Sequence, residues 1–171
     1  GQAEVASSLA GATRRLAGCG NLERLLETAL DCLGSEFGIG HVMLLMHDEG
    51  RGRLYTLASR GYPQSGIGSE IPVGAGVIGI CGRERIPIRI GFMTSEYGYG
   101  RAIRDGVEAD GQGDSLETAI PLPGLPEARS QLAVPITAFD RLLGVLYLEN
   151  VADLHFGYDD EDALVAFAAQ L

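Results

Sequence analysis

Residues 130–150 read SQLAVPITAFDRLLGVLYLEN, and these letters predict a β-hairpin. Residues 131–138 alternate between apolar and other side chains, as expected of a strand with one buried face. Residues 141–150 are apolar on both faces, which is typical of a central strand. Phe139 and Asp140 fit the short turn between the two strands. Two consecutive strands joined by so short a turn must run antiparallel.

A second hairpin is predicted upstream, where HVMLLMHD (41–48) and RLYTLAS (53–59) flank a glycine-rich turn. Shorter elements follow along the chain: a strand at 70–73, a helix at 76–83 and a strand at 86–90. Pro135 predicts an edge position or a bulge, because proline cannot donate a ladder hydrogen bond. Because hairpins dominate, we expect an α+β domain with a mostly antiparallel sheet and helices packed against it.

Apolar residues spaced three and four apart predict two helices before the first strand and one at the end of the chain. The stripe of the first helix is Val5, Leu9, Ala12 and Leu16. The stripe of the second is Leu22, Leu25, Leu26, Ala29, Leu30 and Leu33. The stripe of the last is Leu164, Phe167, Ala168 and Leu171. The glycines flanking Cys19 end the first helix, Asn21 caps the start of the second, and Gly34 is its predicted stop.

The composition excludes several classes of protein. The chain has 171 residues, 46% of them hydrophobic and 21% charged, which suits one folded domain. Its net charge of −10 argues against nucleic acid and against an anionic membrane surface, since both require basic footprints. No apolar run is long enough to span a bilayer. Three widely spaced cysteines match neither a disulfide framework nor a zinc site, so we expect a reducing, cytoplasmic setting.

Four blocks, in this order, resemble a GAF domain over residues 21–171. They are the LLETAL helix leading to HVMLLMHDEG, then IPVGAGVIGICGRERIPIRI, then SQLAVPITAFDRLLGVLYLEN, and finally FGYDDEDALVAFAAQL. The resemblance implies a six-stranded antiparallel sheet with helices on one face and a ligand pocket, under a lid, on the other. It also implies a small-molecule sensor that dimerises through its terminal helices and controls a kinase, cyclase, phosphodiesterase or transcription activator.

Residues 91–127, rich in glycine, acids and proline, are the predicted lid, because loops of this length are usually functional or disordered. An aromatic pocket with one or two cations suits a small anionic or aromatic ligand. The candidate ligand-binding residues of the lid are Phe92, Tyr97, Tyr99, Arg101 and Arg104. In the alternative interpretation, the arginines balance the acids of a solvated loop.

The sequence Gly74-Ala-Gly76-Val77-Ile-Gly79 matches G-x-G-x-x-G. A dinucleotide fold is disfavoured, because that fold needs parallel strands around the motif and the neighbours here are hairpins. The motif then serves a tight turn and close packing of helix on sheet. Gly76 and Val77 are nonetheless candidate ligand contacts, since backbone N–H groups at a helix start can meet an anion.

Cys81 is the cysteine placed nearest the expected pocket, on the short helix. A reactive thiolate would need a lowered pKa, with Arg83 and Arg85 as the candidate sources of positive charge. This arrangement would resemble the free methionine sulfoxide reductases, enzymes that share the GAF fold, but no resolving cysteine is evident. The alternative is a small buried side chain without chemistry.

Asn150, Phe156, Asp160 and Glu161 resemble the signature of cyclic-nucleotide-binding GAF domains. That signature has a lysine where this chain has Val151, which weakens the interpretation. Capping of the last helix explains the same spacing: Phe156 anchors its entry and Asp160 completes half a capping box.

The three histidines do not predict a metal or haem site. His41 and His47 share a strand face, but their side chains would lie about 20 Å apart. No histidine and no cysteine falls in the lid, where the family resemblance would place a haem ligand or a chromophore attachment. The residues therefore identify no cofactor and no catalytic group.

We expect a non-catalytic regulatory domain. Because the chain lacks an initiator methionine and ends within a predicted helix, we expect it to be part of a larger signalling protein. Residues 1–20 form a linker or dimerisation helix, 21–171 the sensory domain, and 158–171 a helix that continues toward an output region. The expected partners are an unidentified small molecule and a second copy of the chain, paired through the terminal helices. In the alternative, the apolar stripes of those helices cover the sheet of their own chain. Cyclic-nucleotide regulation and thiol-dependent reduction remain the alternative functions.

Overall fold

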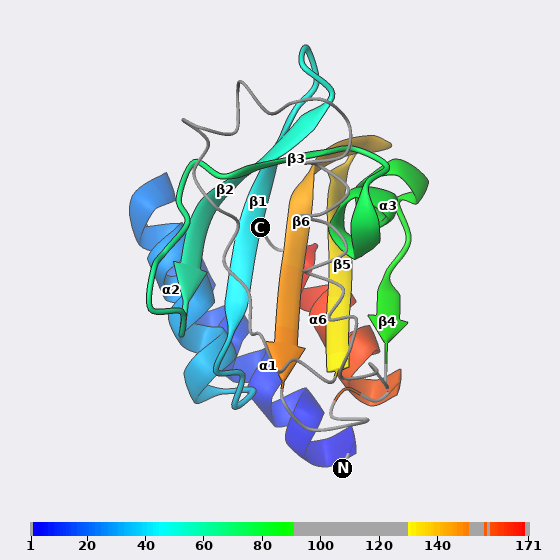
Figure 1. Cartoon of the computed structure of the whole chain (residues 1–171). Helices are drawn as coiled ribbons and strands as arrows, with labels where there is room; N and C mark the ends of the chain where they lie inside the picture. The colour runs from blue at the N-terminus through cyan, green and yellow to red at the C-terminus, as the bar shows by residue number, and fades with distance from the viewer. Residues whose placement is uncertain (1, 91–129, 151–155, 157, 170–171) are drawn as a thin grey trace.

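The computed structural model describes residues 2–90, 130–150, 156 and 158–169, which form six strands and four helices (Figure 1). The strands are β1 (Val42–Asp48), β2 (Arg53–Arg60), β3 (Glu70–Pro72), β4 (Ile88–Ile90), β5 (Ser130–Ala138) and β6 (Arg141–Asn150). The helices are α1 (Gln2–Ala17), α2 (Leu22–Ser35), α3 (Gly76–Glu84) and α6 (Tyr158–Ala168). The sheet order is β3-β2-β1-β6-β5-β4, and every pairing is antiparallel. The predicted α+β class is therefore confirmed.

The β5–β6 hairpin forms as its sequence predicts. Phe139 and Asp140 make the turn with φ of 52° and 61°, which matches the right-handed twist of the strands it joins. β6 lies between β1 and β5, as expected of a strand with two apolar faces. Pro135 pairs with β6, while the described pairing of β5 with β4 extends only over residues 131–133. Pro135 therefore lies where β5 is locally an edge, and a register shift follows at Ile136/Thr137.

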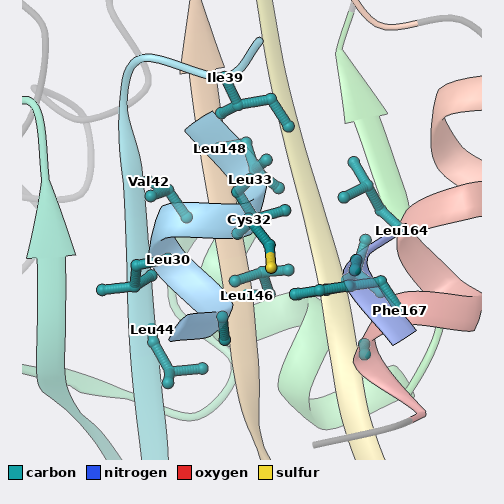
Figure 2. Packing of buried hydrophobic residues seen from close by; sticks show 14 of the residues in the cluster. Leu30, Cys32, Leu33, Ile39, Val42, Leu44, Leu146, Leu148, Leu164 and Phe167 are labelled. Atoms are coloured by element: carbon teal, nitrogen blue, oxygen red, sulfur yellow. The ribbon is translucent and has the colours of Figure 1, made fainter. Parts of the chain in front are cut away.

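The sheet has a separate apolar cluster on each face. On one face, α1, α2 and α6 cover a core that includes Leu33, Leu148 and Phe167 (Figures 1 and 2). Side chains of α2, β1, β6 and α6 meet in this cluster (Figure 2). On the other face, α3 packs over a smaller cluster that includes Met43, Ile78 and Tyr147. Alternation along each strand assigns residues to one cluster or the other.

The start of α2 agrees with the sequence prediction, and its end differs from it. The Asn21 side chain accepts a hydrogen bond from the backbone N–H of Arg24, as an N-cap does. The predicted stop at Gly34 is wrong, because α2 continues to Ser35. The N–H of Gly38 bonds back to the carbonyl of Gly34, which is the αL motif with Gly38 as its left-handed residue, and the N–H of Ile39 bonds to the carbonyl of Leu33.

The stripes of the terminal helices pack within their own chain wherever their side chains are described, which leaves out Val5 and Leu171. Leu16, Leu164 and Phe167 belong to the helix-covered core and are nearly inaccessible. This agrees with the alternative interpretation of the stripes, because these side chains cannot also pair across a dimer. Within the described part of the chain, no helix combines the length and apolar character needed to cross a bilayer.

Candidate functional site

Polar side chains gather on the sheet face that carries α3, at the end of β6 that lies beside β1 and β5. Tyr147 and Glu149 follow Val145 at every second position of β6, so they share its face. Gln131 is the register partner of Glu149 on β5 and points to the same face as Ala133. Glu149 is 3% exposed and Gln131 1% exposed. Buried polar groups of this kind need internal hydrogen bonds or a ligand.

The Glu149 carboxylate is held by two tyrosine hydroxyls. Tyr62 donates to Oε1 over 2.7 Å, and Tyr147 donates to Oε2 over 3.1 Å. Both oxygens of the carboxylate thus accept a phenolic hydrogen bond, and bonds to a charged acceptor are stronger than neutral ones. The arrangement fixes Glu149 on the α3 face of the sheet.

Tyr62 reaches Glu149 because the chain after β2 passes close to the start of β1. Gly61 has a φ of 90°, and a Cβ on it would overlap the carbonyl oxygen of Gly40. The neighbouring carbonyl, that of His41, accepts the backbone N–H of Glu149 at 3.2 Å. The ring of His41 meets the ring of Tyr62 edge-on, with centroids 5.4 Å apart. Gly61 is therefore a positioning residue for Tyr62.

The electrostatics of the cluster keep both tyrosines protonated. Burial raises the pKa of Tyr62 well above its usual value, and the adjacent Glu149 raises it further. The pKa of Tyr147 is raised by burial, by Glu149 and by Tyr62. At neutral pH the two phenols are therefore neutral hydrogen-bond donors to the carboxylate of Glu149.

The structure places three of the predicted ligand-binding residues within α3 itself. Gly76 begins the helix with a φ of 64°. Val77 and Cys81 point into the cluster between α3 and the sheet and are almost inaccessible. The predicted lid residues lie outside the described part of the chain: Phe92, Tyr97, Tyr99, Arg101 and Arg104.

The G-x-G-x-x-G motif serves the turn and the packing predicted for it. The N–H of Gly74 donates to the carbonyl of Gly79 over 2.8 Å, which closes the turn before α3. A Cβ on Gly79 would lie 2.5 Å from the carbonyl oxygen of Pro72. Only glycine therefore lets α3 pack this closely on the end of β3.

Cys81 is a buried thiol, and its environment is the reverse of what a reactive thiolate needs. Burial raises its pKa to about 12. Arg83 donates to Glu84, and Arg85 donates to the carbonyl of Asp140, so neither is engaged with the sulfur. The condition for a reactive thiolate is therefore not met, and Cys81 agrees with the alternative interpretation of a small buried side chain.

The remaining motifs have structural roles where they are described. Phe156 is buried in the helix-covered core, as expected of an anchor for α6. α6 begins at Tyr158, which gives Asp160 the third helical position predicted for it. His47 shares the α3 face with His41, as predicted, and its Nδ1 lies 3.2 Å from the carbonyl oxygen of Leu142. Among the described residues, no group of three His, Cys, Asp or Glu side chains could hold a metal.

The sequence interpretation missed Glu149, Gln131 and Tyr62. The available signal was an acid within LYLEN, in a strand predicted to be buried on both faces. A carboxylate at such a position needs partners. Tyr62 lies in a turn segment, and no local pattern relates it to residue 149.

These features define an α+β domain with a helix-covered face and an opposite face that carries buried polar groups. The family model for the GAF domain matches residues 21–171, and the chain belongs to this family. No curated protein sequence matches the chain.

Several solved structures, GAF domains among them, share the fold. The GAF domain of an Acinetobacter phosphoenolpyruvate-protein phosphotransferase superimposes with a TM-score of 0.71 at 20% identity, covering 96% of this chain and 87% of that one. Free methionine-R-sulfoxide reductase from Neisseria meningitidis, in complex with its substrate, gives 0.74 at 20%, covering 99% and 86%. The A. aeolicus nlh2 GAF domain in an inactive state gives 0.67 at 16%, covering 98% and 92%. At these identities the likeness concerns the fold alone.

Proposed function

We propose that this chain is a regulatory sensory domain that binds a small molecule on the α3 face of its sheet and controls an output region of a larger cytoplasmic protein. One observation carries the proposal: Glu149 is buried on that face and held by the hydroxyls of Tyr62 and Tyr147. Burying a carboxylate is costly. Buried, perturbed groups of this kind concentrate at functional sites.

The position of the cluster suits a sensor. Glu149 and Asn150 end β6, and the chain then leads to Phe156 and α6. β4 finishes at the same end of the sheet, since Ile90 and Glu149 both pair with Gln131, and the chain then enters the predicted lid. A ligand on the α3 face would therefore act next to both segments. Its effect on the output can be no larger than its differential affinity for the two states of the domain.

We also propose that the domain dimerises. The dimer would form through surfaces other than the apolar stripes of the terminal helices, because those stripes are buried in the core. The outer face of α6 is available, where Val165 is 41% exposed. Sedimentation of the chain over a range of concentrations tests this part, and a monomer throughout would contradict it.

The alternative functions have less support. The raised pKa of Cys81 disfavours a thiolate at neutral pH, which a reductase of the free methionine sulfoxide type would need there. Val151 cannot supply the positive charge of the lysine in the cyclic-nucleotide signature. The Neisseria reductase nevertheless indicates that the fold accommodates a small molecule, since that structure contains its substrate.

Thermal shift with a metabolite library that includes cyclic nucleotides and haem tests the proposal, because a ligand of the native state raises the melting temperature. We expect at least one compound to stabilise the wild-type chain and to lose most of its effect in Glu149→Gln. Glu49→Gln is the matched control, since Glu49 is exposed and paired with Arg141. A library without any stabilising compound would contradict the proposal, and equal stabilisation of Glu149→Gln would place the site elsewhere.

A further inference from the structure

Gln131 presents an acceptor that the described protein does not satisfy. Its side chain is 1% exposed, and Oε1 has no hydrogen-bond partner within the part of the chain that the structure describes. Native proteins leave few buried polar atoms in this condition, because an unpaired acceptor loses its hydration without compensation. A donor that is not part of the described protein would resolve it.

The orphan acceptor lies beside a negative charge. Gln131 and Glu149 are register partners on β5 and β6, and residues directly opposite one another place their Cβ atoms about 5 Å apart. Glu149 is fixed by Tyr62 and Tyr147, which remain neutral at neutral pH because their pKa values are raised. The described site therefore places the amide oxygen of Gln131 close to the buried carboxylate of Glu149.

This pairing selects among ligand groups. An anionic group would be repelled by Glu149 and would leave Oε1 of Gln131 without a donor. A neutral hydroxyl or amide could donate to Oε1 but would gain little from the carboxylate. An ammonium group offers three donors and a positive charge. The rings of Tyr62 and His41, which meet edge-on nearby, add an aromatic surface that favours a cation.

We infer that the ligand of this domain carries a primary ammonium group, which donates to Oε1 of Gln131 and lies in the field of Glu149. This inference rests on the sensory function proposed above and narrows it to one class of ligand. Gln131 is then a specificity residue. Its unpaired oxygen destabilises the ligand-free domain and gains a donor when the ligand binds.

Matched pairs of compounds test the inference in the complete 171-residue chain. The probes are L-leucine, L-phenylalanine and phenethylamine. The partners of the two amino acids, 4-methylpentanoate and 3-phenylpropanoate, lack only the ammonium group, and 2-phenylethanol carries a hydroxyl in place of the ammonium group of phenethylamine. Cyclic AMP and cyclic GMP serve as anionic comparisons. We expect at least one ammonium compound to raise the melting temperature by about 2 °C or more, and its partner to have no effect.

Gln131→Leu is the decisive variant. Because leucine removes the orphan acceptor and nearly keeps the volume, we expect the ligand-free variant to melt at the same or a higher temperature. Its affinity for the stabilising amine should fall about tenfold or more by calorimetry. Gln64→Leu, at an exposed position, should change neither property. A Gln131 side chain with a purely structural hydrogen bond would instead make Gln131→Leu less stable.

The outcomes separate this inference from the proposed function. Stabilisation by the deaminated compounds or cyclic nucleotides alone would overturn the ammonium assignment and leave the sensory function standing. Unchanged amine affinity in Gln131→Leu would likewise overturn it. If none of these probes binds, the ammonium assignment is contradicted; if no compound of the metabolite library binds either, the proposed function is contradicted as well.

Discussion

Gly61 lies so close to Gly40 that any side chain on Gly61 would overlap the Gly40 carbonyl oxygen. This contact joins the segment after β2 to the start of β1 and brings the hydroxyl of Tyr62 to Glu149. The φ of 90° at Gly61 is, in addition, strained for any residue with a Cβ.

Gly61→Ala should therefore lower the free energy of unfolding by about 3 kcal/mol, measured by denaturant titration. Gly20→Ala is the control, because a Cβ on Gly20 would meet no atom within 4 Å, and it should change stability by less than about 0.5 kcal/mol. Equal stability of the two variants would mean that this contact does not hold Tyr62 in place.

The tyrosines around Glu149 predict an unusual alkaline titration. Both pKa values are raised, so Tyr62 and Tyr147 should stay protonated in the native chain when a free phenol ionises near about pH 10. In the denatured chain all six tyrosines should ionise together. We expect the native phenolate absorbance to be unchanged in the double variant Tyr62→Phe/Tyr147→Phe. A loss of amplitude in that variant would show that these phenols ionise with the others.

The single variants test the hydrogen bonds themselves. Tyr62→Phe and Tyr147→Phe each remove one donor to Glu149, and each should cost about 1–2 kcal/mol of unfolding free energy at neutral pH. Denaturant titration measures the loss. A double variant whose loss differs from the sum of the two would indicate coupling through the shared carboxylate.

Much of the fold could be predicted from the sequence, because side chains at every second position of a strand lie on the same face of the sheet. Leu132, Val134 and Ile136 enter the helix-covered core as their spacing predicts. The stop of α2 was misplaced because Gly34 and Gly38 are both plausible by composition. Only the backbone hydrogen bonds from Gly38 and Ile39 to the carbonyls of Gly34 and Leu33 identify Gly38 as the glycine that ends the helical segment.

The candidate site was harder to predict, because it depends on contacts between distant segments. Tyr62 and Glu149 are 87 residues apart, and the close approach at Gly61 that joins them leaves no periodic signal. Cys81 was correctly placed on α3, but its pKa depends on burial, which the local sequence does not specify. The predicted lid residues 91–127 lie outside the described residues, so they remain predictions.

The buried thiol of Cys81 predicts a pH dependence of stability. Its pKa is about 12 when folded, against 9.0 for an unperturbed thiol. A group whose pKa is raised on folding stabilises the native state below the unfolded pKa and loses that contribution as pH rises toward the folded pKa. The relevant window therefore runs from about pH 9 to about pH 12.

Cys81→Ala removes this contribution and leaves a small cavity. The variant should be less stable than the wild type by about 1 kcal/mol at neutral pH. The difference should shrink by up to about 1.4 kcal/mol per pH unit above pH 9, because only the wild type loses the thiol contribution. Parallel stability curves for the two proteins between pH 9 and the onset of alkaline unfolding would contradict the raised pKa of Cys81.

Arg89 connects the edge of the sheet to the last helix. It lies in β4, pairs there with Leu132, and its Nη1 donates to the carbonyl oxygen of Phe156 over 3.3 Å. Phe156 is buried at the entry to α6. This bond joins the edge strand of the sheet to the segment that enters α6.

Arg89→Gln should therefore loosen α6 more than the sheet. Loss of a charge-assisted hydrogen bond of about 1.5 kcal/mol would raise hydrogen exchange in α6 by about tenfold, while β1 and β6 keep their protection. Arg85→Gln is the matched control: Arg85 also bonds to a distant carbonyl, that of Asp140, but at the β5–β6 turn. Exchange in α6 should be unchanged in that variant. A uniform rise across sheet and helix in Arg89→Gln would instead mean that Arg89 stabilises the whole domain and provides no separate link to α6.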